Sequence, residues 1–334
     1  MKNQPKQPGF FRGIIRVTSP TEMITFIFIV LMLALTAIFQ DHLDTIGIVI
    51  NSSILLSAIV IVNFIRTKSD SKFVRGLHTF YIIPVVLLVF KTVEKLSFSI
   101  HGRDYDNILM AIDRGFFGAN PTVWLYEHIP VMPLFVEIMQ ICYFSYYFLP
   151  IILAVELFIR RRHDHTEDRY TDELEQLRFI MIYGLLTSYL GYFSMPGIGP
   201  RFTIHDFWGI TKELPGIYFT EPIRWFINLA ENIRVGMTNA QAAHVVTRDV
   251  FPSGHTELAL LSMILAFRFN ARARWVILFL GTGLIFSTVY LRYHYVIDVL
   301  GGTLLALITL WSAPPLMRYF MGLKRKIGRY LGKA

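Results

Sequence analysis

The chain has 334 residues, of which 54% are hydrophobic and 15% aromatic, and its formal net charge is +8. This length would accommodate two soluble domains, but the apolar content is higher than soluble enzymes have. Cys142 is the single cysteine, so an intramolecular disulfide is excluded. It lies inside an apolar run, which argues against a cysteine metal site. The composition therefore indicates a multipass membrane protein.

Eight apolar segments are candidates for transmembrane helices, each of which needs about 20 mostly apolar residues. The segments cover residues 22–39, 46–65, 77–97, 133–159, 177–195, 255–270, 274–291 and 295–317. The expected fold class is an all-α integral membrane protein with about eight spans, six of them forming a catalytic core, and with additional interfacial helices.

Basic residues test this topology, because Lys and Arg gather in cytoplasmic connections. Alternate segments hold 22 of the 32 basic residues, within 2–16, 66–75, 160–178, 268–274 and 318–333. Both termini are therefore expected in the cytoplasm. The net charge is mainly a topology signal, with attraction to anionic lipid as a second consequence. Nucleic-acid binding is not expected, since no basic stripe with interleaved aromatic residues occurs elsewhere.

The chain is expected to divide into three parts. Residues 1–76 form a basic tail and a two-helix hairpin, 77–317 a six-helix catalytic core, and 318–334 a basic cytoplasmic tail. Within the core, the segment from Asp104 to Pro133 is expected to be an amphipathic helix at the membrane interface. The loop 196–253 is too apolar for a linker, which favours short helices on the outer surface that form a lid or a lipid entrance.

Two polar clusters stand at the start of apolar segments in the core. His294 and Asp298 are four residues apart, so on a helix the carboxylate holds the imidazole in one tautomer and orientation. Ser253 and Gly254 precede His255 at a predicted helix start, where unpaired N–H groups favour an anion such as phosphate. With the predicted topology, both clusters lie at the extracytoplasmic border. Two histidines beside an anion site indicate phosphoryl transfer.

A transferred phosphoryl group carries negative charge, so the site needs fixed cations and hydrogen-bond donors. The candidates for phosphate binding are Arg201, Arg292 and Arg248, together with Ser253 and the backbone N–H of Gly254. An arginine in an outer loop also commonly binds lipid headgroups without taking part in catalysis. That alternative stays open for all three, and a structural role is favoured for Arg248.

On these motifs the chain resembles the type 2 phosphatidic acid phosphatase superfamily, and within it the branch of inositol phosphorylceramide synthases. The resemblance covers residues 77–317 and rests on the Pro-Ser-Gly-His cluster and the later His-x-x-x-Asp. A further segment is similar to the inositolphosphotransferase branch at Asp113, Gly118, Pro121, Trp124 and Leu125.

The resemblance implies a two-step reaction on a membrane lipid at the extracytoplasmic face. His294, oriented by Asp298, attacks phosphorus and becomes a phosphohistidine, while His255 protonates the departing oxygen. His255 then deprotonates the acceptor, which is water or a lipid or sugar hydroxyl. No metal or other cofactor is expected.

Two positions depart from the phosphatase pattern. Ser194 stands where the phosphatases carry a lysine, and Thr288 where they carry an arginine before the nucleophile. The phosphotransferase branch also lacks that arginine, which favours a transferase. The alternatives are a strict phosphatase that uses water, and a lipid-binding or transport protein without turnover.

Overall fold

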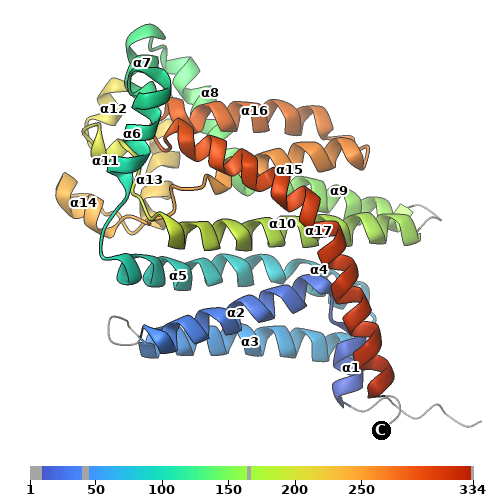
Figure 1. The fold of residues 1–334 in the computed structure, drawn as a ribbon. Helices are drawn as coiled ribbons and strands as arrows, with labels where there is room; N and C mark the ends of the chain where they lie inside the picture. Colours follow the sequence, from blue (N-terminus) through green and yellow to red (C-terminus); the bar gives the residue numbers. More distant parts are fainter. Residues whose placement is uncertain (1–9, 40–44, 164–166, 332–334) are drawn as a thin grey trace, which may run out of the picture. The chain divides into compact units, whose positions relative to one another are not determined.

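In the part of the chain that the structure describes, every regular element is a helix (Figure 1). The structure is a computed structural model, and it describes residues 10–39, 45–163 and 167–331. The expectations for the start of the basic tail and for the turn of the N-terminal hairpin fall on residues outside these ranges. Within them, the predicted all-α fold class is confirmed.

The first of two compact units comprises Met1–Lys95 and Trp311–Ala334. Its helices are α1 (Phe10–Val17), α2 (Pro20–Ile38), α3 (Thr45–Lys68), α4 (Lys72–Phe80) and the start of α5 (Ile82–His101). Helix α2 begins at a capping box, because the Ser19 hydroxyl accepts from the Glu22 N–H and the Glu22 carboxylate accepts from the Ser19 N–H. Helices α2 and α3 pack side by side as a hairpin (Figure 1).

The second unit, Leu96–Leu310, contains both motif clusters. Helices α9, α10, α15 and α16 form its centre: α10 contacts α9 and α15, and α16 contacts α15 and α8 (Figure 1). In chain order its elements are α6 (Asp106–Phe117), α7 (Pro121–His128), α8 (Pro133–Phe144), the 3-10 helix η2 (Ser145–Tyr147), α9 (Leu149–His163), α10 (Glu167–Ser194), α11 (Pro200–Thr203), α12 (Ile210–Glu213), α13 (Thr220–Ala230), α14 (Asn239–Val245), α15 (Gly254–Arg268), α16 (Arg274–Tyr290) and the start of α17 (Val296–Tyr330).

Several helices are long and apolar enough to cross a membrane. Four of them in the described chain meet both conditions, and a bent pair gives a fifth candidate. The four are Pro20–Ile38, Thr45–Lys68, Lys72–Ser97 and Val296–Tyr330, and the pair is Pro133–Tyr147 with Leu149–Arg160. These helices support a multipass membrane protein, while the count of eight spans stays a prediction.

Some predicted spans differ from the observed helices. The segment 133–159, expected as one span, bends by 54° between α8 and α9. Pro150 lies in the first turn of α9 and has no N–H to continue the hydrogen-bond ladder, which accounts for the break. The last span, expected to end at 317, continues as α17 to Tyr330 through Pro314 and Pro315.

The two connecting segments of the core also form helices. The stretch from Asp104 to Pro133 contains two short helices, α6 and α7, in place of one, because Gly118 ends α6 in the left-handed conformation with φ 71°. The expectation of short helices within 196–253 is confirmed by α11, α12, α13 and α14. A lid or entrance role for them stays a prediction.

Candidate active site

Two histidine side chains from different helices face each other in the second unit. The Nε2 atom of His294 lies 3.2 Å from Nδ1 of His255, which belongs to the first turn of α15. The Nδ1 atom of His294 lies 3.0 Å from the Val250 carbonyl oxygen and 3.3 Å from a carboxylate oxygen of Asp298. Because both partners of this Nδ1 accept hydrogen bonds, it carries the proton and Nε2 keeps its lone pair. The arrangement presents a nucleophilic nitrogen to the space beside His255.

Asp298 is fixed by contacts at the start of α17. Its carboxylate accepts a hydrogen bond of 2.8 Å from the Tyr295 N–H, and its backbone carbonyl accepts one of 3.0 Å from the Ser253 N–H. The second bond joins the start of α17 to the start of α15. Gly302 permits this approach, because a Cβ atom there would collide with the Ser253 carbonyl. The junction of the two helix starts therefore sets the spacing of the two imidazoles.

A carboxylate on α6 caps α17 from outside that helix. Asp113 is 2% exposed, and it accepts hydrogen bonds of 2.8 Å from the backbone N–H groups of both Val296 and Ile297. Helix starts leave such N–H groups without partners inside the helix, and a carboxylate also suits the positive end of the helix dipole. Asp113 thus positions the turn that carries Asp298.

A second carboxylate on α6 holds the loop that precedes α11. Asp106 accepts hydrogen bonds from the Ile198 and Gly199 N–H groups at 3.0 and 2.8 Å, and from the Tyr295 hydroxyl at 3.0 Å. Gly199 has φ 89°, and a Cβ atom there would lie 2.7 Å from the Tyr293 carbonyl oxygen. Only glycine suits both the backbone conformation and this close approach.

The positioning roles of Asp106 and Asp113 were missed by sequence reasoning. In the sequence, Asp113 stands out only as part of the family resemblance. The seven-residue spacing of the pair places both on one face of a helix, which is a signal that the sequence contains. Their partners are backbone N–H groups more than 90 residues away. Every residue type except proline has such a group, so the sequence does not indicate which of them are the partners.

Of the three candidate arginines, Arg201 is the one whose charge acts on His294. It is 5% exposed, forms an ion pair with Glu231, and lies with its guanidinium 4.7 Å from the ring centroid of Tyr293. Burial is the main cause that lowers the pKa of His294; the positive charge of Arg201 lowers it further, and the negative charge of Glu231 raises it. Arg201 is therefore placed to meet an anionic substrate near His294.

Arg292 contacts Glu213 and Tyr126, which are not contacts of Arg201. It is 1% exposed and has φ 68°, forms an ion pair with Glu213, and lies 4.8 Å from the ring centroid of Tyr126. Its Nε and Nη2 atoms have no hydrogen-bond partner among the described residues. No described contact joins Arg292 to His294 or His255, although the sequence places it two residues before His294.

Arg248 is engaged in holding its own loop. Its guanidinium lies 3.2 Å from an Asp104 carboxylate oxygen and donates to the carbonyl oxygens of His244 and Val246, at 2.7 and 2.5 Å. These partners occupy most of its donor capacity. These contacts fit the structural alternative, and binding of substrate phosphate by Arg248 stays a prediction.

Ser253 and Gly254 shape the start of α15. The fully buried Ser253 hydroxyl is the N-cap and accepts hydrogen bonds from the N–H and the hydroxyl of Thr256, at 3.2 and 3.1 Å. A Cβ atom on Gly254 would lie 2.6 Å from the Tyr192 hydroxyl oxygen. The observed role of the Ser253 side chain is thus to fix the helix start that carries His255.

Two tyrosines have their rings against His255, and the sequence did not single them out. The rings of Tyr143 and Tyr146 have centroids 4.9 and 4.3 Å from that of His255, and Tyr143 stacks on Tyr293 at 4.1 Å. Tyr143 lies in the last turn of α8 and Tyr146 in η2, just before the bend into α9. More than 100 residues separate them from His255, and tyrosine in an apolar segment is too common to be a signal.

Burial gives His294 a pH response that can be measured. The side chain is buried, which disfavours the charged imidazolium and lowers the pKa of His294 below its ordinary value of 6.5. A group with a lowered pKa stays neutral until the pH falls below that pKa. We expect the acid limb that reports this nucleophile in a pH profile of kcat/KM to lie below pH 6.5. A limb above pH 7 that His294 determines would contradict the burial effect.

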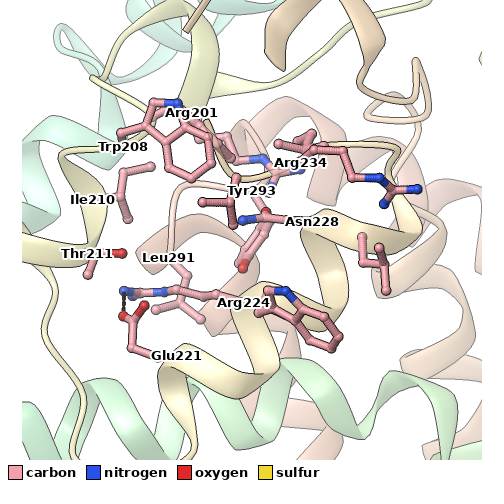
Figure 2. A pocket seen from close by; sticks show the side chains of 15 residues that line it. Arg201, Trp208, Ile210, Thr211, Glu221, Arg224, Asn228, Arg234, Leu291 and Tyr293 are labelled. Atoms are coloured by element: carbon pink, nitrogen blue, oxygen red, sulfur yellow. Dashed lines mark hydrogen bonds and ion pairs between the residues drawn. The ribbon is translucent and has the colours of Figure 1, made fainter. Parts of the chain in front are cut away.

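A cavity of about 180 Å³ adjoins the site, and Figure 2 shows it from close by. Arg201 and Tyr293 belong both to its wall and to the surroundings of the histidines. Trp208 and Trp225 line it from other directions. Among the described residues, no group of three or more His, Cys, Asp and Glu side chains is arranged to hold a metal ion.

Comparison with known proteins gives one match. Residues 107–312 match the PAP2 superfamily, and this range includes all of α6 except Asp106, and both motif clusters. The comparisons with curated proteins and with solved structures give no match. The matched range covers more than half of the chain. It contains His255, His294 and Asp298, the three residues whose geometry is described above. The chain belongs to the PAP2 superfamily.

Proposed function

We propose that this protein is a lipid phosphotransferase that works through a phosphohistidine, similar to the inositol phosphorylceramide synthases. Membership of the PAP2 superfamily supports a phosphatase or phosphotransferase activity on lipid phosphate. The observation that carries the finer proposal is the pair of imidazoles 3.2 Å apart, with the Nδ1 atom of His294 bound to two acceptors.

In the first proposed step, the phosphate of a phospholipid enters beside His294, and His255 turns aside to admit it. The Nε2 lone pair of His294 attacks phosphorus, and the bond from phosphorus to the departing oxygen breaks. His255, protonated on both ring nitrogens for this step, gives one proton to that oxygen and becomes neutral. Asp298 stabilises the positive charge that develops on the imidazole of His294.

In the second step, the acceptor hydroxyl occupies the place of the departed group. His255 takes the hydroxyl proton, the acceptor oxygen attacks phosphorus, and the bond between phosphorus and Nε2 of His294 breaks. A lipid or sugar hydroxyl yields a transfer product, whereas water yields a phosphatase reaction. Neither step uses a metal ion or another cofactor.

Two side chains favour a transferase over a strict phosphatase. Ser194 and Thr288 stand where the phosphatases carry a lysine and an arginine. Their hydroxyls donate to carbonyl oxygens of their own helices, at Gly191 and Ile285, over 2.6 and 2.7 Å. Neither side chain therefore supplies a charge or a free donor to the substrate. Arg201, with its adjoining cavity, is the cation near His294.

The site is proposed to face the extracytoplasmic side, with both termini in the cytoplasm. The support is the gathering of 22 of the 32 basic residues in alternate connections, none of which contains His255 or His294. Labelling of single cysteines introduced on each side of α15 and α17 with a membrane-impermeant reagent would test this orientation.

The proposed activity is tested by supplying a phospholipid labelled in its phosphate, in detergent, with and without a lipid alcohol. We expect the label to move to the alcohol, with the transfer product exceeding free phosphate. Free phosphate as the sole labelled product would exclude a strict transferase and leave the phosphatase. Binding of the lipid without any labelled product would leave a lipid-binding or transport protein.

A further inference from the structure

The cavity beside Arg201 has features that the proposed reaction does not use. Its volume of about 180 Å³ is below the ~300–1,000 Å³ that is usual for small-molecule sites, so it accommodates a headgroup and not a whole lipid. Its walls come from α12, α13 and the segments that flank α11 and α14 (Figure 2). Trp208 and Trp225 supply broad apolar surfaces, and polar side chains lie between them.

The polar groups of this cavity divide into engaged and unengaged ones. Arg201 is paired with Glu231, and Arg224 with Glu221. Arg234, an exposed residue of the lining, has no ion-pair partner within the described ranges.

Asn228 offers a further unengaged group at the centre of the cavity in Figure 2. Its side-chain amide makes no hydrogen bond to any residue that the structure describes, and it is half-buried. A half-buried amide between two aromatic walls forms its hydrogen bonds with whatever fills the space. Asn228 and Arg234 thus provide donors that are available to a ligand.

The charges of the wall favour an anion. Three arginines line the cavity against one carboxylate, that of Glu221, which already pairs with Arg224 at 3.4 Å. Counting Glu231 as the partner of Arg201 still leaves the charge of Arg234 uncompensated. A guanidinium binds carboxylate and phosphate oxygens through paired donors.

We propose that this cavity binds a second anionic group on the headgroup of the lipid substrate, in addition to the phosphate that reacts. The inference rests on the proposed function and specifies its substrate class: a phospholipid whose headgroup carries a carboxylate or a further phosphate. Arg234 and Asn228 are the specificity-determining residues, and the two tryptophans enclose the rest of the headgroup.

The cavity lies in the right place for this role. Its wall contains Tyr293, the neighbour of His294 in the chain, and the Tyr293 ring stacks on Tyr143, which stacks on His255. Arg201 lies over the Tyr293 ring and influences the pKa of His294. A lipid whose phosphorus lies at His294 therefore has this cavity within reach of the atoms next to the reacting phosphate.

Binding without turnover tests the inference. The full-length His294→Ala protein, in a neutral detergent, is titrated calorimetrically with dioctanoyl phosphatidylserine and with dioctanoyl phosphatidylethanolamine, which differ only by a carboxylate. We expect a Kd about tenfold lower for the serine lipid, the effect of one charge-assisted hydrogen bond. Arg234→Ala should remove most of that preference, and Arg272→Ala, which changes an exposed arginine outside the cavity, should keep it.

A second variant tests the inference independently of Arg234→Ala. Asn228→Asp conserves shape and adds a negative charge, so it should abolish or reverse the preference even if Arg234→Ala does not fold. Equal affinities for the two lipids in the parent protein, or an unchanged preference in both variants, would overturn the inference. Inorganic phosphate is also tested as a competitor of the serine lipid. If phosphate displaces the lipid, and if Arg234→Ala weakens phosphate binding as much as lipid binding, the cavity is a site for a free anion and the headgroup assignment is overturned.

The outcome is separable from that of the proposed function. Turnover of labelled phospholipid by the unmodified protein, without any carboxylate preference in binding, would overturn the headgroup inference alone. A carboxylate preference in a protein that transfers no label would overturn the proposed function and leave the anionic headgroup site.

Discussion

Replacing His294 with alanine is expected to lower the rate of transfer from a labelled phospholipid by roughly 10⁴-fold or more, the scale on which removal of a nucleophile acts in covalent enzymes. The expected loss is large because no other side chain that the structure describes presents an unprotonated nitrogen at the same place. Rapid quench of the unmodified protein with labelled lipid, followed by peptide mass analysis, should locate the phosphoryl group on His294. The same peptide from His294→Ala should carry no label.

A matched control separates this effect from unfolding. His128 is an exposed histidine on α7, and its ring stacks on Trp124, so His128→Ala changes a histidine outside the candidate site. We expect His128→Ala to retain activity and His294→Ala to retain the thermal unfolding temperature of the parent. Retained transfer in a folded His294→Ala protein would remove the covalent mechanism. Label on another residue would identify that residue as the nucleophile.

Replacing His255 with alanine is expected to reduce turnover by about 10²–10⁴-fold, the range of general acid–base catalysis. The reason is that the departing oxygen loses its proton donor and the acceptor loses its base, while the nucleophilic nitrogen of His294 is unchanged. The loss should depend on the leaving group. A lipid whose departing alcohol is acidic, such as a nitrophenyl phosphodiester, should recover much of the rate of the first step.

This dependence distinguishes an acid from a structural residue. With the nitrophenyl substrate, His255→Ala should release a burst of nitrophenol and then accumulate phosphorylated His294, because the second step still lacks its base. His255→Gln retains hydrogen bonding but not proton transfer, and it should behave like the alanine variant. An equal loss for acidic and ordinary leaving groups would contradict the acid role of His255 and favour one in packing against Tyr143 and Tyr146.

The local parts of the site were readable from the sequence. The spacing of His294 and Asp298 predicts one helix face, and the structure shows a contact of 3.3 Å between them. The expected helix start at Ser253 is likewise observed. Both predictions depend on backbone periodicity and capping chemistry, which act over a few residues. For the same reason the connecting segment after α5 could be expected to be helical, although its division at Gly118 was not foreseen.

The roles of the arginines could not be read in this way. Arg201, Arg248 and Arg292 are equivalent as residue types, yet the first contacts Tyr293, the second holds a loop, and the third pairs with Glu213. Which of them meets the substrate depends on which carboxylates lie nearby. Such pairings join residues separated by 30 to 144 positions, and no short-range pattern encodes them.

By itself, the sequence determined that this is an apolar, helical, multipass chain and that a histidine is oriented by a carboxylate at the start of a helix. These features follow from composition and from the 3.6-residue period, which are local properties. The tertiary structure alone decided the approach of His255 to His294, the capping of α17 by Asp113, and the cavity beside Arg201. Each of these requires separate helices to pack together, and packing depends on the shapes of surfaces that are distant in the chain.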